Sequence, residues 1–318
     1  MSTEYLMEAQ GISKTFGGGV RAVSNVDLAL RAGETLGIVG ESGCGKSTTV
    51  KMMLRLLQPD AGRVFFEGRD IARLRGRERK EFRRRVQVVP QNPQTSLNPR
   101  LTVFDSLAFH LRAHGFPRRA RTTRVAELLD RVGLDPSYAQ RYPHQMSGGQ
   151  LQRAAIARAL CSDPDVVICD EAVSALDKSV QAQVLNLLTR LQSDLGIAYL
   201  FISHDLAVVQ HISDRVAVMY LGRVVEQASA DELWRGPRHP YTAALLSSTP
   251  GRGRERVVLD GELPSPSNPP SGCGFRTRCP VTVEACTREW PDLQVRDRGH
   301  LAACVHLDPQ ALMAPAAG

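Results

Sequence analysis

The chain has 318 residues, of which 42% are hydrophobic, and a formal net charge of +7. This length leaves room for about two domains with real cores. No run approaches the ~18 consecutive apolar residues of a membrane span, and the first residues lack the charged-then-apolar pattern of a signal peptide, so we expect a cytosolic protein.

The N-terminal part predicts a sheet followed by a glycine-rich loop. Residues 5–30 alternate in the manner of short antiparallel strands, with a turn at Gly17-Gly18-Gly19. An apolar strand over 36–39 then leads into a helix predicted from Ser47 to about Leu57. The loop between them consists of Gly40, Glu41, Ser42, Gly43, Cys44, Gly45, Lys46, Ser47 and Thr48.

This loop has the spacing of a P-loop, the phosphate-binding turn of many nucleotide hydrolases. Gly43 and Gly45 let successive backbone N–H groups point at one phosphate chain, and the dipole of the following helix favours the same charge. Lys46 would reach the β- and γ-phosphates, and the Ser47 hydroxyl would bind Mg²⁺. The sequence therefore predicts a site for ATP and Mg²⁺.

The middle of the chain predicts a parallel α/β sheet. Strands are expected at 63–66 and 86–89, and the apolar strands at 166–169, 198–202 and 216–219 alternate with amphipathic helices in the manner of a parallel sheet. Residues from about 92 to 158 form a predicted helical subdomain, because their apolar positions recur at helical spacing.

Two carboxylates follow the strand over 166–169. Asp170 is expected at the carboxyl edge of the sheet, where it would hold Mg²⁺ through water. Glu171 comes next and is placed to accept a proton from the attacking water as general base. Together with the P-loop, this pair indicates an ATPase.

A second glycine-rich motif, Met146-Ser147-Gly148-Gly149-Gln150-Leu151-Gln152-Arg153, resembles the signature sequence of ATP-binding cassette (ABC) proteins, which usually has Leu at its first position. The resemblance implies that Ser147, Gly148, Gly149 and Gln150 close over the γ-phosphate bound by a partner subunit. Two nucleotides would thus lie between two such domains.

Other motif positions of the family match as well. Gln91 matches the glutamine that senses the γ-phosphate side and the permease, and it would also bind Mg²⁺. Asp177 matches the loop that crosses the dimer interface, and His204 matches the switch histidine. Phe16 falls where the family stacks an aromatic ring on adenine, although a core Phe is an alternative. One departure is Ala172, where Pro commonly follows the glutamate. The resemblance implies an ABC ATPase core: a RecA-like parallel sheet, an antiparallel β subdomain and a helical insertion.

Residues after about 235 differ in composition, being rich in Pro, Gly and Arg. The segments 238–246, 261–266 and 268–273 resemble the C-terminal extension of oligopeptide and dipeptide importer ATPases. We therefore expect an ABC ATP-binding domain over 1–235, an extension over 236–307 and a disordered tail over 308–318.

The resemblance implies an ATPase subunit that powers the import of oligopeptides or dipeptides, with nickel and glutathione importers as alternatives. Its partners would be a second ATPase subunit, which is a paralogue or an identical chain, two transmembrane permeases and, through the complex, an extracytoplasmic peptide-binding protein. It would work peripherally at the cytoplasmic face of the cell membrane.

Two rival functions are a soluble ABC ATPase acting on DNA or ribosomes and a P-loop kinase. The first requires a long coiled-coil insertion or two cassettes in one chain, and the sequence has neither. The signature motif has no role in the second. Two arginine-rich runs, over 73–85 and 118–124, are read as solvated helix faces, so no nucleic-acid partner is expected.

Four cysteines cluster in the extension with the spacing C-x5-C-x6-C-x17-C: Cys273, Cys279, Cys286 and Cys304. So small a unit cannot build a core unaided, and four thiolates suit an iron–sulfur cluster or, as second choice, structural Zn²⁺. Similar importers carry a four-iron cluster there, which implies a [4Fe–4S] centre. Four unligated cysteines remain an alternative, and His300 or His306 would substitute if only three thiolates bind. Cys44, Cys161 and Cys169 are read as packing residues.

Overall fold

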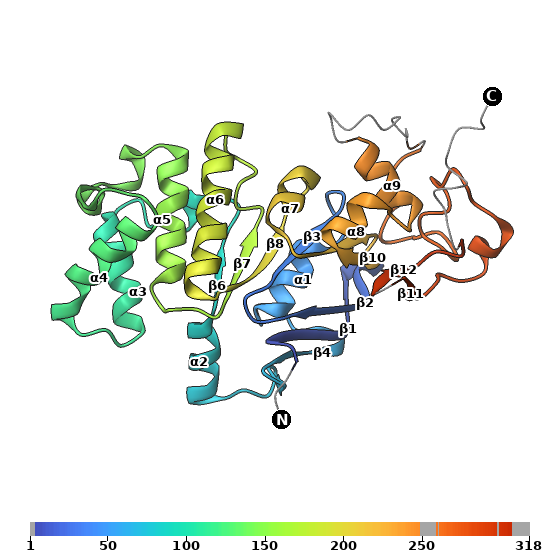
Figure 1. Ribbon diagram of the computed structural model, residues 1–318. Coiled ribbons are helices and arrows are strands. Elements are labelled where there is room, and N and C mark those ends of the chain that lie inside the picture. Colours follow the sequence, from blue (N-terminus) through green and yellow to red (C-terminus); the bar gives the residue numbers. More distant parts are fainter. Residues whose placement is uncertain (1–3, 249–258, 260, 298, 307–318) are drawn as a thin grey trace. The chain divides into compact units, whose positions relative to one another are not determined.

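The computed structural model describes residues 4–248, 259, 261–297 and 299–306 (Figure 1). These residues form two compact units. The first comprises the described parts of Met1–Ala29, Thr35–Ala72 and Ser203–Gly318, and the second comprises Leu30–Glu34 and Arg73–Ile202. The predicted tail over 308–318 lies outside the described residues.

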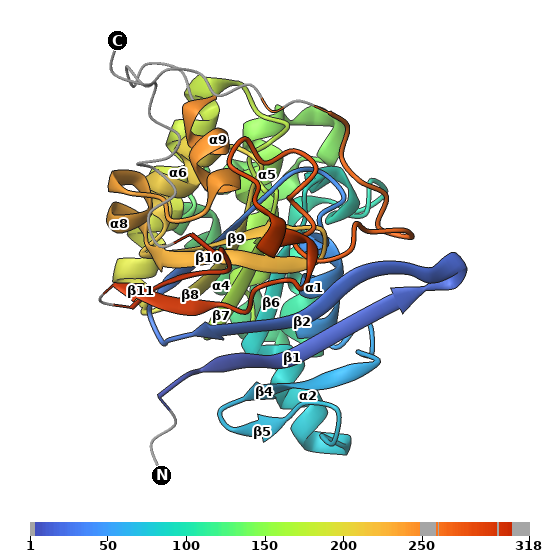
Figure 2. The same cartoon turned by 90° about the vertical axis from the view of Figure 1, so that its right-hand side faces the viewer.

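An antiparallel sheet in the first unit has the strand order β2-β1-β4-β5 (Figure 2). Its strands are β1 (Met7–Phe16), β2 (Val20–Leu30), β4 (Ala61–Phe66) and β5 (Arg69–Asp70). Met7 lies opposite Phe66 in the ladder of β1 and β4, and both side chains are buried. The antiparallel strands expected over residues 5–30 are thus confirmed.

A second run of strands in the first unit has the order β11-β12-β10-β9-β3. These strands are β3 (Thr35–Val39), β9 (Arg215–Tyr220), β10 (Arg223–Ser229), β11 (Gln294–Asp297) and β12 (His300–Ala302). All five residues of β3 are buried, as expected for a central strand, and β3 pairs in parallel with β9. The P-loop begins directly after the carboxyl end of β3.

The C-terminal extension contributes strands that the sequence did not predict. Strand β12 pairs antiparallel with β10, with Glu226 opposite Ala302, and β11 pairs with β12. Strand β12 is only three residues long, so it carries almost no periodic signal of its own. The pairing joins the cysteine-bearing segment to the core sheet of this unit.

The helices of the first unit are α1 (Lys46–Met53), α7 (Leu206–Ile212), α8 (Ala230–Arg235) and α9 (Pro240–Ser247). The predicted end of the P-loop helix at Leu57 is wrong, because α1 ends at Met53. Arg55 has a φ of 56°, which breaks the helix, and Leu56 beyond it is 70% exposed.

The second unit contains three parallel strands in the order β8-β7-β6: β6 (Val86–Val89), β7 (Val166–Asp170) and β8 (Ala198–Ile202). Its helices are α2 (Gly76–Arg85), α3 (Val103–Ala113), α4 (Arg118–Arg131), α5 (Gly148–Leu160) and α6 (Lys178–Leu195). Helices α3, α4 and α5 pack on one another, which gives the helical character expected for this part of the chain (Figure 1).

The arginine-rich runs of the second unit are held at several points by the protein itself. On α2, Arg84 bonds to Glu81 and to the backbone oxygen of Ser162, while Phe82 is buried beneath the helix. On α4, Arg124 pairs with Glu127 and Asp163. Within the part of the chain that the structure describes, no helix has both the length and the apolar character needed to cross a lipid bilayer.

Candidate functional site

The predicted site residues are divided between the two units, and each set is described by itself. The first unit holds the P-loop, Phe16, His204 and the four cysteines of the extension, and the second holds Gln91, Asp170, Glu171, the signature motif and Asp177.

The P-loop follows β3 in a backbone conformation that only glycine adopts readily. Gly40, Gly43 and Gly45 have φ angles of 153°, 79° and 104°. A Cβ atom on Gly40 would stand 2.2 Å from the backbone oxygen of Met219, and one on Gly45 would stand 2.3 Å from that of Ala22. The close approach of neighbouring backbone therefore requires glycine at both positions.

Lys46 begins helix α1 and is bonded to the loop itself. Its side chain is buried, and Nζ donates to the backbone oxygens of Gly40 at 2.7 Å and Glu41 at 3.0 Å. Ser47, the next residue, is exposed in the first turn of the helix. The Cys44 thiol is buried, and burial raises its pKa, which fits the expected packing role.

Glu41 in the same loop is held by residues from the C-terminal extension. Its backbone N–H donates a 3.0 Å hydrogen bond to the Tyr241 hydroxyl. Its carboxylate accepts two bonds from the Arg278 guanidinium, at 2.8 Å from Nη1 and 3.1 Å from Nη2. Neither Tyr241 nor Arg278 was expected at the site from the sequence. The extension motif around Tyr241 was a signal that could have found the first, but no local signal marks the second.

Phe16 and His204 both lie at the surface of the first unit. Phe16 ends β1 and is 43% exposed, so its ring is not a core side chain. His204 is exposed in the short turn before α7. Beside it, the Ser203 hydroxyl accepts a hydrogen bond from the Asp205 N–H, and the Asp205 carboxylate caps α7, so the backbone on either side of His204 is held.

In the second unit, Gln91 and Glu171 are in direct contact. Gln91 follows β6, Glu171 follows β7, and these parallel neighbours pair with Val89 opposite Cys169. The side-chain amide of Gln91 donates to the Glu171 carboxylate at 2.9 Å. Asp170 is the last residue of β7 and is partly buried. The expected order of strand, aspartate and glutamate is therefore present, with Gln91 beside the glutamate.

The signature motif forms the exposed N-terminus of α5. Ser147 caps this helix in a capping box, in which its hydroxyl accepts from the Gln150 N–H and the Gln150 side chain accepts from the Ser147 N–H. A Cβ atom on Gly149 would stand 2.4 Å from Cγ1 of Val180, so glycine allows α5 to approach α6 closely. Asp177 caps α6 through a 2.9 Å bond from the Val180 N–H.

The four cysteines of the extension line one pocket, together with His239, His306 and Phe275. Burial, with a smaller contribution from the neighbouring cysteines, raises the pKa of Cys273 to about 11 and that of Cys279 to about 12. Among the described residues, no three or more His, Cys, Asp or Glu side chains are arranged to hold a single metal ion.

The two histidines considered as substitute ligands have other partners. His300 Nε2 lies 2.6 Å from the buried Glu226 carboxylate, and His306 Nε2 lies 2.8 Å from the Val281 backbone oxygen. His300 is thus paired with Glu226, whereas His306 lies in the lining of the cysteine pocket.

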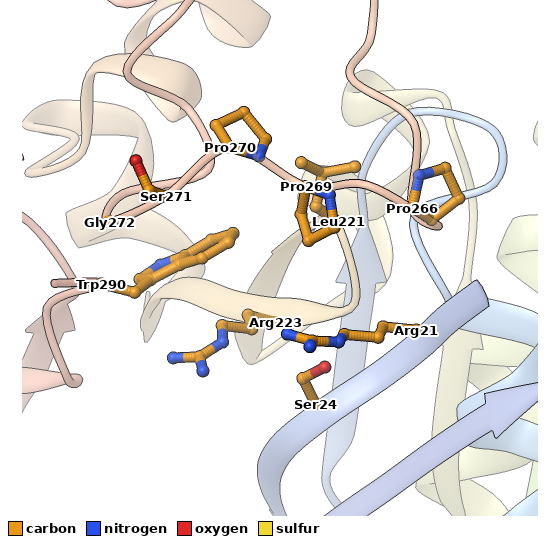
Figure 3. A pocket seen from close by; sticks show the side chains of 10 residues that line it. All are labelled: Arg21, Ser24, Leu221, Arg223, Pro266, Pro269, Pro270, Ser271, Gly272 and Trp290. Carbon is orange, nitrogen blue, oxygen red and sulfur yellow. The ribbon is translucent and has the colours of Figure 1, made fainter. Parts of the chain in front are cut away.

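A further pocket of about 260 Å³ in the first unit lies outside the predicted set of site residues. Figure 3 shows the prolines of the extension, Pro266, Pro269 and Pro270, facing Arg21 and Arg223. The proline-bearing segment is hydrogen-bonded to β2 at this point, since the Arg21 N–H donates to the Pro266 backbone oxygen at 3.0 Å.

Two family models match the chain. The model described as ABC transporter matches residues 23–174, and the one described as the C-terminal region of oligopeptide/dipeptide transporters matches residues 225–286. The first covers most of the predicted motifs, and the second begins in β10 and ends at Cys286.

Relatives match along nearly the whole chain. The chain is 51% identical to the oligopeptide transport ATP-binding protein AppF of Bacillus subtilis, over 95% of this chain and 94% of that protein. It is also 51% identical to a probable peptide ABC transporter ATP-binding protein of Sinorhizobium fredii, over 98% of this chain and 92% of that protein.

Solved structures share the fold. The protein cbiO1 of Clostridium perfringens, part of the ABC transporter complex cbiONQ, superposes with a TM-score of 0.68 at 28% identity, covering 73% of this chain and 92% of that one. A dimeric, post-hydrolysis ATP-binding cassette, MJ0796, bound to ADP and Pi superposes with a TM-score of 0.63 at 29% identity, covering 70% of this chain and 98% of that one.

Proposed function

The chain belongs to the family of ABC transporter ATP-binding proteins, and from this we propose that it powers the import of oligopeptides or dipeptides through a membrane complex. The observation that carries the substrate class is the extension, which matches the C-terminal region of oligopeptide/dipeptide transporters. The names of the two relatives given above support the same class. A nickel or glutathione importer is the second candidate.

ATP hydrolysis is the activity of this family, and the site residues receive roles from the proposal. The P-loop from Gly40 to Thr48 binds the phosphates, Phe16 stacks on adenine, and Ser47 with Asp170 and Gln91 holds Mg²⁺. Glu171 accepts the proton of the attacking water, and the 2.9 Å bond from Gln91 supports this role because it orients the carboxylate. His204 stabilises the γ-phosphate, and its exposed position in the turn before α7 fits this role.

The signature motif acts on the nucleotide of a partner subunit. Its support is the exposed N-terminus of α5, where Ser147 and Gly148 offer a hydroxyl and backbone N–H groups to an anion. Asp177 begins α6 beside it and lies at the same interface. The structurally similar MJ0796 is a dimeric cassette, which supports two chains closing on two nucleotides. A paralogous partner ATPase is our first choice.

The permease contact is proposed on the helical part of the second unit. Phe109 on α3 is 54% exposed and would be one of the contact residues. The segment from Asn92 follows Gln91 directly, so a movement at the γ-phosphate side would be passed to this region. The complex would hold the chain at the cytoplasmic face of the membrane, next to two permeases.

The four cysteines of the extension hold a [4Fe–4S] cluster in this proposal. Their support is that all four line one pocket, where a bound cation would stabilise the thiolate forms that burial disfavours. Zinc would require ligands about 2.3 Å from one centre. Zinc is the second choice, and among the described residues no three or more His, Cys, Asp or Glu side chains are arranged to hold a single metal ion. The centre would fold and anchor the extension.

Reconstitution tests the substrate class. The chain, with the permeases and ATPase subunit that co-purify with it, is placed in vesicles together with its binding protein, and ATP hydrolysis is measured with peptides of two to five residues, Ni²⁺ or glutathione. We expect stimulation by peptides. Stimulation by Ni²⁺ or glutathione alone would replace the peptide assignment, and co-purification with nucleic acid instead of permeases would overturn the transport role.

A further inference from the structure

Glu41 of the P-loop is held at three points by three different parts of the first unit. Its backbone N–H bonds to Tyr241 on α9, its backbone oxygen accepts from Lys46, and its carboxylate accepts both terminal nitrogens of Arg278. The Arg278 side chain is only 9% exposed and that of Glu41 28%. This is a two-bond, charge-assisted pair in a mostly desolvated place, so it is stronger than a surface ion pair.

Arg278 is itself positioned by the cysteine-bearing turn. The Arg278 N–H donates to the Phe275 backbone oxygen at 3.0 Å, and the Cys273 N–H donates to the Cys286 backbone oxygen at 2.8 Å. The Phe275 ring is buried and lies 5.3 Å from the Tyr220 ring and 5.5 Å from the Tyr241 ring. Tyr241 and Arg278 thus reach Glu41 from one packed aromatic cluster.

The turn between β9 and β10 makes a further contact with the same loop. The Gly222 N–H donates to the Cys44 backbone oxygen at 3.0 Å. Leu221, the residue before Gly222, lines one pocket together with Pro269 and Gly272 of the extension (Figure 3). The extension therefore bonds directly to Glu41, whereas Cys44 is held by the β9–β10 turn, whose Leu221 lines the same pocket as Pro269 and Gly272.

We propose that Arg278 is a positioning residue for ATP binding: it holds the P-loop in its phosphate-binding shape and neutralises the Glu41 carboxylate. The loop gathers backbone N–H groups that bind a triphosphate. An unpaired carboxylate on the same loop would weaken this binding, because the carboxylate and the phosphates are both negative and repel each other. Pairing with Arg278 removes that repulsion. Together with Tyr241, it also lowers the ordering cost that nucleotide binding would otherwise have to meet.

The competing explanation is that the ion pair only fastens the extension to the core. In that case losing Arg278 would lower the melting temperature without changing nucleotide affinity. The two explanations differ in what happens to the P-loop amides and to KM.

The test compares Arg278→Gln and Arg278→Lys with the control Arg288→Gln in the full-length chain. Arg288 lies in the same extension, and its pair with Glu284 is fully at the surface, with side chains 74% and 84% exposed. For Arg278→Gln we expect the Kd for ADP, measured by calorimetry, and the KM for ATP in the assembled transporter to rise about three- to tenfold with kcat unchanged. Arg278→Lys should recover part of the affinity because it keeps the charge but not the two-bond geometry. The control should stay at the wild-type value.

Two further measurements make the proposal falsifiable without relying on one variant. The double variant Glu41→Gln, Arg278→Gln should bind ADP no more weakly than Arg278→Gln alone, because the unpaired carboxylate is gone. Hydrogen exchange should show faster exchange of the amides from Glu41 to Gly45 in Arg278→Gln and not in the control. Unchanged KM and P-loop exchange with a lowered melting temperature, or an additive loss in the double variant, would overturn the proposal.

Discussion

The side-chain amide of Gln91 donates a 2.9 Å hydrogen bond to the carboxylate of Glu171, 80 positions further along the chain. The contact follows from the parallel register of β6 and β7, in which Val89 lies opposite Cys169 and both strands end at the same edge. A general base needs a fixed direction as well as a suitable pKa. In the proposed role of Glu171 as base, the bond from Gln91 would give the carboxylate that direction.

Glu171→Gln should retain ATP binding and lose turnover by ~10²–10⁴-fold, because the amide keeps the shape of the carboxylate but cannot accept the proton of the attacking water. ATP-bound dimers should accumulate. Steady-state hydrolysis and size-exclusion chromatography with ATP measure both effects. The control is Glu127→Gln, an exposed glutamate on α4 that pairs with Arg124. Normal hydrolysis by Glu171→Gln would remove this residue from the role of base.

Ser147→Arg should block hydrolysis at the partner's P-loop while ATP binding at the variant chain's own P-loop stays nearly intact. The reason is that the arginine side chain would occupy the proposed anion site at the exposed N-terminus of α5. Mixed dimers that carry the change in one subunit, assayed for binding and turnover at each site, measure this. Loss of ATP affinity at the chain's own P-loop would contradict the action on a partner.

Gly45→Ala should abolish ATP binding and lower stability. A φ of 104° costs an alanine roughly 1–2 kcal/mol, and its Cβ would also stand 2.3 Å from the Ala22 backbone oxygen. Gly196→Ala is the matched control, because Gly196 also has a positive φ, 68°, but has open space around the added Cβ. Thermal unfolding with and without ATP should show reduced stability in both variants and loss of the ATP-induced stabilisation only in Gly45→Ala. Retained ATP-induced stabilisation in Gly45→Ala would mean that the P-loop accommodates the added Cβ atom.

Anaerobic purification should yield about four iron and about four sulfide per chain, with little zinc. Replacing Cys273, Cys279, Cys286 and Cys304 together by serine should remove the iron and destabilise the extension. Cys161→Ser, a change at a buried cysteine of the second unit, should leave the iron content unchanged. Iron, sulfide and zinc analysis, with proteolysis of the extension, measures these outcomes. A metal-free chain whose quadruple variant folds and transports normally would exclude the centre.

The sequence alone determined the elements and motifs that depend on neighbouring residues. Apolar strands followed by the P-loop and by Asp170-Glu171, and the serine-glycine start of α5, are local patterns whose spacing carries their chemistry. The alternation of strands and helices gave the parallel sheet for the same reason. The end of α1 was missed because a single residue, Arg55, adopts a positive φ that no composition signal announces.

Only the tertiary structure decided which distant residues meet. Arg278 and Glu41 are separated by 237 positions, and neither the arginine nor its neighbours differ in pattern from the other arginines of the extension. The same holds for β12, whose three residues find β10 through backbone hydrogen bonds rather than through a side-chain period. Local periodicity records which face of an element is buried, but partners across the fold are chosen by packing and by charge compensation, and these exist only once the chain has folded.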